Sequence, residues 1–156
     1  MGTTAAQRTV DPWSDLDWID ARAPRANHAF VAVLSIAAMI AGWQWLVAVI
    51  AAQLVIGLTF GRRYCLACLF YFTVIQPRIG EGRVEDARAP RFANVLGAAF
   101  TTLATAAFVT GLEGAGWAIT GIVAGLSSLS ALTGICVGCV IYARIWGCED
   151  CRVPAG

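Results

Sequence analysis

All six cysteines of this chain occur in pairs with the spacing Cys-x-x-Cys. The pairs are Cys65 with Cys68, Cys136 with Cys139, and Cys148 with Cys151. Two cysteines three positions apart share one face of a helix, so each pair can close a disulfide or offer two thiolates to one metal ion. At a helix N-terminus the unpaired amides and the dipole favour the thiolate, which makes the first cysteine nucleophilic. The pattern therefore indicates thiol chemistry.

The residues ahead of the first two pairs predict that a new helix begins near each of them. Gly134 precedes Cys136, and the segment Gly61-Arg62-Arg63 leads into Cys65. The two arginines would also add positive potential beside Cys65, which favours its thiolate.

The first interpretation is dithiol/disulfide or sulfane-sulfur exchange, which needs an accessible cysteine of low pKa and a resolving neighbour. Cys136 is the predicted nucleophile and Cys139 the resolving thiol, with Cys65 and Cys68 as a second pair. This reaction requires no cofactor.

Two other interpretations use the same cysteines. Cys65, Cys68, Cys136 and Cys139 could form one tetrahedral four-sulfur site for zinc or an iron-sulfur cluster. They could also be inert packing residues in a membrane subunit or anchor of a larger complex. The third pair favours exchange, because Cys148 and Cys151 could shuttle to the second pair, although the acidic residues between them would raise their pKa.

Other polar residues are expected to have structural roles. His28, the single histidine, has no partner at ligand spacing and is predicted to lie at an interface without catalytic work. Tyr71 and Tyr142 follow their thiol pairs at the same distance and are expected to anchor short helices at headgroup depth, and Gln53 to hydrogen-bond between helices. With a net charge of +1, the chain is not expected to bind nucleic acid.

The chain also contains a repeat that relates the first two thiol pairs. The hexapeptide Asp-Ala-Arg-Ala-Pro-Arg occurs at residues 20–25 and again at 86–91, and each copy precedes a long apolar run that leads to a Cys-x-x-Cys pair. We therefore divide the chain into an N-terminal segment (1–19), repeat 1 (20–76), a linker (77–85), repeat 2 (86–146) and a C-terminal tail (147–156).

The apolar runs predict membrane-spanning helices. Apolar residues make up 58% of the sequence, and no Asp, Glu, Lys or Arg occurs in residues 26–61. A span needs about 20 apolar residues, so each run can hold a helical hairpin. We expect helices at about residues 23–42, 46–60, 90–110 and 117–133, with turns at 42–45 and 111–116. Residues 69–76 and 140–146 are too short to span, so each would lie in the interface or re-enter the bilayer, and Pro77 should end the first.

Two spans in each half make a parallel repeat, with both thiol pairs on one side of the membrane. The arginines from Arg22 onward lie in the N-terminal, middle and C-terminal segments and none lies in either hairpin turn. The positive-inside tendency then places both termini and all six cysteines at the cytoplasmic face. The fold class expected is an all-α membrane protein of four transmembrane helices, with lipid as its surroundings.

The segment Gly134-Ile-Cys-Val-Gly-Cys-Val-Ile-Tyr142 resembles the C-terminal signature of the small bacterial integral membrane proteins known as domain of unknown function 4395. The likeness runs from about Asp20 to Tyr142. The resemblance implies a four-span protein of the bacterial inner membrane with no assigned reaction. It also implies relatives that occur beside thioredoxin-like and rhodanese-like sulfurtransferase proteins, and such proteins are the expected partners. Cys65 and Cys68 are not expected in every member, and Ala143 stands where the family often has proline.

Overall fold

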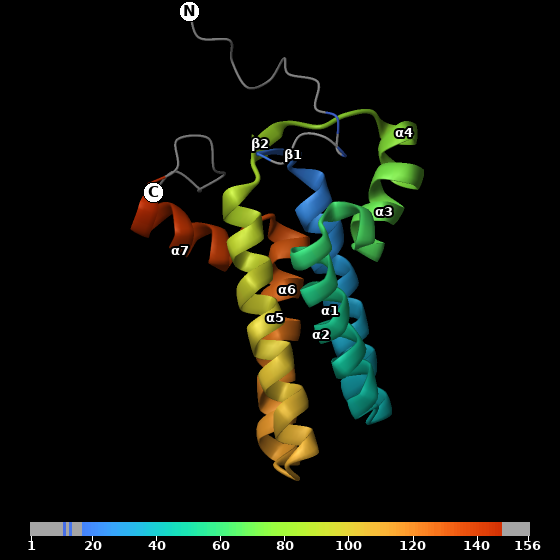
Figure 1. Cartoon of the computed structure of the whole chain (residues 1–156), viewed down its shortest axis with the longest axis vertical. Helices are drawn as coiled ribbons and strands as arrows, with labels where there is room; N and C mark the ends of the chain where they lie inside the picture. Colours follow the sequence, from blue (N-terminus) through green and yellow to red (C-terminus); the bar gives the residue numbers. More distant parts are fainter. Residues whose placement is uncertain (1–10, 12, 14–16, 148–156) are drawn as a thin grey trace, which may run out of the picture.

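The computed structural model describes residues 11, 13 and 17–147, and this part of the chain is helical apart from two short strands (Figure 1). The four long helices are α1 (Arg22–Ala41), α2 (Gln44–Phe60), α5 (Arg88–Val109) and α6 (Glu113–Thr133). The shorter elements are β1 (Trp18–Asp20), η2 (Arg62–Tyr64), α3 (Leu66–Phe70), η3 (Tyr71–Ile75), α4 (Gln76–Ile79), β2 (Val84–Asp86) and α7 (Val137–Trp146). The predicted helical class is confirmed, whereas the strands were not predicted.

Helices α1, α5 and α6 are long and apolar enough to cross a membrane. Helix α2 is equally apolar in character but has 17 residues, at the short end of the range for a span. The predicted helix ends agree with the structure within a few residues except at α6, which begins at Glu113 and not at Trp117. Gly114 and Gly116 lie in this helix and not in the turn: a Cβ at Gly116 would lie 2.5 Å from the Phe108 ring, so this glycine lets the ring pack against α6.

The four long helices form a bundle in which each half of the chain packs on the other. Helix α1 packs mainly against α6, and α2 packs mainly against α5. Both hairpins turn at the same end of the bundle (Figure 1), where Gly42 and Gly111 adopt positive φ. Ala38, Val47 and Ala104 form a fully buried cluster toward this end, because small side chains let the helix backbones approach closely.

At the opposite end, β1 and β2 pair in antiparallel fashion and join the two halves. Ile19 and Glu85, the residues before the two hexapeptides, lie opposite one another in this ladder. The bonds beyond them are reciprocal: the N–H of Ala21 donates to the carbonyl of Arg83 (2.9 Å), and that of Ala87 to the carbonyl of Asp17 (2.8 Å). Ala21 and Ala87, which are equivalent residues of the two hexapeptides, therefore make equivalent backbone contacts. We call this the sheet end of the bundle.

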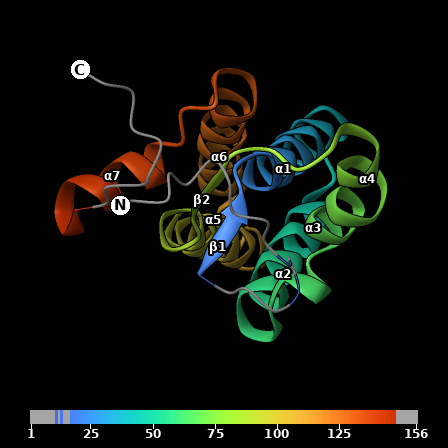
Figure 2. The same ribbon diagram turned by 90° about the horizontal axis from the view of Figure 1, so that it is seen from above.

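The two helices that follow the thiol pairs lie at the sheet end on opposite flanks of the bundle (Figures 1 and 2). The helix after the first pair does not end at Pro77, as predicted, but continues through η3 and α4 to Ile79. The π-helical turn η3 closes with a bond from the Gln76 N–H to the Tyr71 carbonyl, and Pro77 falls in the first turn of α4, where no backbone donor is needed.

Tyr71 is a buried structural residue and not the interface anchor we expected. It is 2% exposed, and its hydroxyl donates to Oδ2 of Asp20 at 2.9 Å. The same carboxylate accepts the backbone N–H of Gly82 (3.0 Å) and that of Arg22 (2.9 Å). A buried carboxylate needs such donors, and burial together with Asp20 raises the pKa of Tyr71. The bonds fix α3 and η3 against the start of α1.

Helix α7 packs on α5 through a close contact at Gly138. A Cβ at this position would lie 2.8 Å from the Cβ of Ala93 and 2.9 Å from its Cα. The glycine between Cys136 and Cys139 thus sets how closely the second pair approaches the bundle.

We expect Gly138→Ala to lower the free energy of unfolding by about 1–3 kcal/mol, because the added methyl overlaps the Ala93 backbone. The measurement is thermal unfolding of the protein in detergent. Gly125→Ala is the matched control, since nothing lies within 4 Å of a Cβ there; it should leave stability unchanged or raise it by up to about 1 kcal/mol. Equal stability of the two variants would contradict the α5–α7 contact.

Candidate thiol sites

The first pair lies at the start of α3, where Cys65 is the N-cap residue. Its Sγ accepts the backbone N–H of Cys68 at 3.3 Å, in place of the oxygen that usually caps a helix. Both cysteines are buried, with exposures of 6% and 8%. The predicted helix start at this pair is therefore confirmed.

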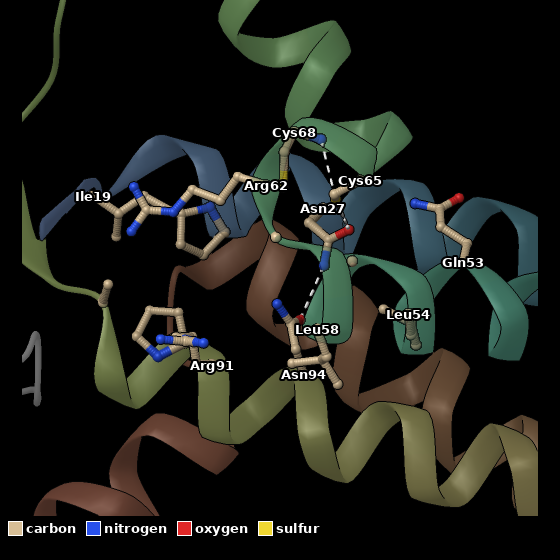
Figure 3. Close-up of a pocket in the computed structure, with 15 residues that line it drawn as sticks. Ile19, Asn27, Gln53, Leu54, Leu58, Arg62, Cys65, Cys68, Arg91 and Asn94 are labelled. Atoms are coloured by element: carbon tan, nitrogen blue, oxygen red, sulfur yellow. Dashed lines mark hydrogen bonds between the residues drawn. The ribbon is translucent and has the colours of Figure 1, made fainter. Parts of the chain in front are cut away.

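Amide side chains surround Cys65 in a cavity of about 80 Å³ (Figure 3). The Cys65 thiol donates to Oδ1 of Asn27 at 3.7 Å, and Nδ2 of Asn27 donates to Oδ1 of Asn94 at 3.0 Å. Gln53 lies next to Cys65, and its buried Nε2 has no hydrogen-bond partner among the described residues. This N–H can donate a hydrogen bond to the Cys65 sulfur once that sulfur is a thiolate. We predicted that Gln53 hydrogen-bonds between helices; the structure instead places it beside the Cys65 thiol.

The hydrogen bonds around Cys65 favour its thiolate. The contact with Cys68 lowers the pKa of Cys65 to about 7, against the opposing effect of burial, and Gln53 lowers it further. The same contact and burial raise the pKa of Cys68. One thiol of the pair is therefore prepared as a nucleophile and the other is held protonated.

The second pair repeats this arrangement at the start of α7. Cys136 is the N-cap, and its Sγ accepts the backbone N–H of Cys139 at 3.4 Å. Both cysteines are partly exposed, unlike the first pair. A small cavity of about 30 Å³ beside them, which we call the charged cavity, is lined by residues of both halves together with the charged side chains of Arg25 and Glu85.

His28 contacts the second pair, contrary to the expectation that it has no partner. Its Nε2 lies 3.7 Å from Sγ of Cys136. The bond from Cys139 and the contact with His28 lower the pKa of Cys136 to about 4, while burial opposes them. The pKa of Cys139 is raised by Cys136, by burial and by Glu85. Cys136 is thus the more strongly activated and the more accessible of the two N-cap thiols.

Each thiol pocket is completed by the other half of the chain. His28 and Asn94 follow their hexapeptides at the same distance; His28 lines the pocket of Cys136, and Asn94 that of Cys65. The sequence carries this signal only as a shared offset from the hexapeptide. The meaning of this shared offset is clear only when it is known that α1 packs on α6 and α2 on α5.

The structure places both described pairs at the sheet end but in separate pockets. In the part of the chain that it describes, no three His, Cys, Asp or Glu side chains are grouped closely enough to hold a metal ion. The four-cysteine metal site therefore stays a prediction from the sequence. Cys148 and Cys151 lie outside the described residues, so their predicted auxiliary role has no structural counterpart.

Comparison with known families gives one match. A family model described as a domain of unknown function (DUF4395) matches residues 19–146. These residues include both described thiol pairs, all four long helices and the two strands except for Trp18, and they stop short of Cys148. No curated protein and no solved structure matches the chain.

We expect His28→Phe, which keeps an aromatic ring at this position but removes both ring nitrogens, to raise the pKa of Cys136. Because a thiolate is lost when the pH falls below its pKa, the variant should lose reactivity at a pH where the wild type keeps it. A rise of about one unit would halve the alkylation rate of Cys136 near pH 5. The measurement is iodoacetamide labelling against pH, with each cysteine followed by mass spectrometry. Cys65 is the internal control, and its midpoint should stay near 7. An unchanged Cys136 midpoint would show that His28 does not act on the thiol.

Proposed function

Since the chain belongs to the DUF4395 family, which carries no assigned reaction, we propose from its own residues that it is an integral membrane thiol protein exchanging disulfide electrons or sulfane sulfur with a soluble partner. The observation that carries the proposal is the N-cap position of both first cysteines. In each pair the sulfur accepts the N–H of the second cysteine, which activates one thiol and places the resolving thiol next to it.

The reaction with a disulfide partner proceeds in two balanced steps. The Cys136 thiolate attacks one sulfur of the partner, so that a mixed disulfide forms, the partner's S–S bond breaks and its other sulfur leaves as a thiolate. Cys139 then loses its proton and attacks Cys136, which releases the partner's first sulfur. Two electrons pass to the partner, and Cys136 and Cys139 end as a disulfide. With a persulfide donor, Cys136 instead attacks the outer sulfur; the donor's S–S bond breaks, the donor's inner sulfur leaves as a thiolate, and Cys136 becomes the persulfide.

The two pairs differ in access, which assigns them different roles. Cys136 is partly exposed and faces a charged cavity, so it receives the soluble partner. Cys65 is buried among amides, so it exchanges only when the sheet end opens or when the second pair reaches it. A thioredoxin-like or rhodanese-like protein presents its reactive sulfur at a surface and suits the first situation.

We place the protein in the bacterial inner membrane with four spans arranged as two parallel repeats. Helix α2 would be the fourth span, since its 17 mostly apolar residues suffice if it is not strongly tilted. The reciprocal bonds of the two hexapeptides and the exchange of partners between hairpins support a duplicated unit. Arginine placement puts the sheet end and both thiol pairs at the cytoplasmic face.

We expect Cys139→Ser to trap a mixed disulfide between Cys136 and an oxidised thioredoxin, because the second step is removed. The trapped species should exceed the wild-type amount at least tenfold, measured on non-reducing gels and assigned by mass spectrometry. Cys68→Ser, the same change in the buried pair, is the matched control and should trap little.

Two results would count against this function. Equal trapping in Cys136→Ser, Cys139→Ser double variants would show that another thiol reacts. One stoichiometric zinc in protein purified without chelator, lost in both Cys65→Ser and Cys136→Ser, would replace exchange with the metal site.

The topology predicts which positions a membrane-impermeant maleimide labels on intact cells. Trp43→Cys and Leu112→Cys, both in exposed hairpin turns, should be labelled from outside. Glu81→Cys, between the halves at the sheet end, should be labelled only after permeabilisation, as should Cys148 and Cys151. Labelling of Glu81→Cys on intact cells would mean that α2 does not cross.

A further inference from the structure

A second and larger cavity opens onto Cys136 from the apolar side of the bundle. It measures about 260 Å³ and lies between α5, α6 and α7, with α1 and α2 closing its inner wall. Cys136, His28 and Ser130 line both this cavity and the small charged one. The sulfur of Cys136 therefore stands between a polar pocket at the sheet end and an apolar cavity inside the bundle.

The wall of the large cavity is mostly hydrocarbon. Val31, Leu54, Leu96 and Val123 contribute to it, and the polar side chains in the lining are His28, Asn94, Ser127 and Ser130. A polar peptide entering such a space would lose its hydrogen bonds to water, which disfavours a protein segment as occupant. An apolar molecule with one or two acceptor oxygens suits it better.

The exposed side chains in the lining indicate that the cavity has a mouth at the side of the bundle. Phe100, Ile122 and Leu126 line it and are 39%, 52% and 43% exposed. They belong to α5 and α6, two helices long enough to cross a membrane, so in a bilayer this mouth faces lipid and not water. Whatever enters must be dissolved in the membrane.

The cavity is the size of a substituted ring. Apolar cavities of about 150 Å³ take up benzene, and this one is larger. A fatty acyl chain could fill it too, but no group on such a chain reacts with a thiolate. A lipid-soluble quinone has both the ring and the capacity to accept the two electrons of a dithiol.

We propose that the cavity binds the ring of a membrane-dissolved quinone, which oxidises the Cys136–Cys139 dithiol. This inference rests on the proposed thiol exchange and adds the second substrate to it. The Cys136 sulfur adds to a ring carbon and forms a C–S bond. Cys139 then attacks the Cys136 sulfur, the S–S bond forms, the C–S bond breaks and its electron pair stays with the ring. The ring takes up two protons, which balance the two that the thiols lose, and leaves as the hydroquinone.

The second pair thereby links two substrates that cannot meet. A soluble dithiol partner reduces the Cys136–Cys139 disulfide from the charged cavity, by the exchange described above run in reverse, and the quinone oxidises the resulting dithiol from the lipid side. The buried Cys65 has no comparable neighbour: the cavity beside it is about 80 Å³, too small for a substituted ring.

The test uses the full chain in lipid nanodiscs, reduced, freed of reductant and kept under anaerobic conditions. The probe is a short-tailed benzoquinone with all four ring positions substituted, so that stable thiol adducts do not form. We expect one quinone to be reduced for each Cys136–Cys139 pair oxidised, followed by quinone absorbance and by mass spectrometry of the disulfide. Cys136→Ser should abolish the reaction.

Cavity-filling variants separate this inference from the proposed function. Leu126→Trp and Ile122→Trp should slow quinone reduction at least tenfold and leave disulfide exchange with oxidised glutathione unchanged. Leu129→Trp is the matched control, because Leu129 is 42% exposed on the same helix but outside the cavity lining, and it should change neither rate.

Each other outcome decides against the inference. Glutathione exchange without quinone reduction would overturn the quinone site and leave the thiol function standing. Equal quinone rates in all three tryptophan variants would mean that lipid alone fills the cavity. Absence of both reactions in the wild type would overturn the inference and the proposed function together.

Discussion

The antiparallel pairing of β1 with β2 determines how the two halves of the chain meet, and the thiol sites depend on it. Three residues on each side place both hexapeptides at one end of the bundle, so α1 and α5 start side by side and each packs against the hairpin partner of the other. Neither half could build its thiol pocket alone, because His28 of the first half serves Cys136 and Asn94 of the second lies beside Cys65.

Much of the helical plan could be predicted from the sequence because apolar run length is a strong signal. The hexapeptides correctly marked helix starts, and the return of charge at Arg62 marked the end of α2. The errors arose where a local signal was overridden by packing. Gly116 suggested part of a turn but lies in α6 and accommodates the Phe108 ring. Pro77 suggested a stop but follows a π-helical turn that tolerates it.

The local features of the thiol sites could be predicted from the sequence, but their long-range contacts could not. Cysteine spacing identified both pairs and the helix starts beside them, since these are local features. The contact between His28 and Cys136 joins residues 108 positions apart, and the pairing of Tyr71 with Asp20 joins residues 51 apart. No periodicity within one helix reports such contacts. The contact of His28 with Cys136 follows from the exchange of partners between hairpins, and that of Tyr71 with Asp20 from the return of η3 to the start of α1 within repeat 1.

The two halves also show how one motif acquires two environments. Asp20 accepts the Tyr71 hydroxyl and draws the first short helix into the core, whereas its counterpart Asp86 pairs with Arg88, which lowers the pKa of that carboxyl. Tyr142 is half-buried and packs on Phe92 of α5 and on Trp146 of α7. The first thiol pair is thereby enclosed and the second is open.

The N-cap role of Cys136 ties reactivity to secondary structure. The sulfur that attacks a substrate is also the atom that accepts the N–H of Cys139 and caps the N-terminus of α7. Once that sulfur is bonded to another atom it is a poorer acceptor, so the first turn of α7 loses part of its anchoring while Gly138 still rests on Ala93. Oxidation of one sulfur would thus loosen the first turn of a helix that packs on α5 through Gly138 and through the rings of Tyr142 and Trp146 against Phe92.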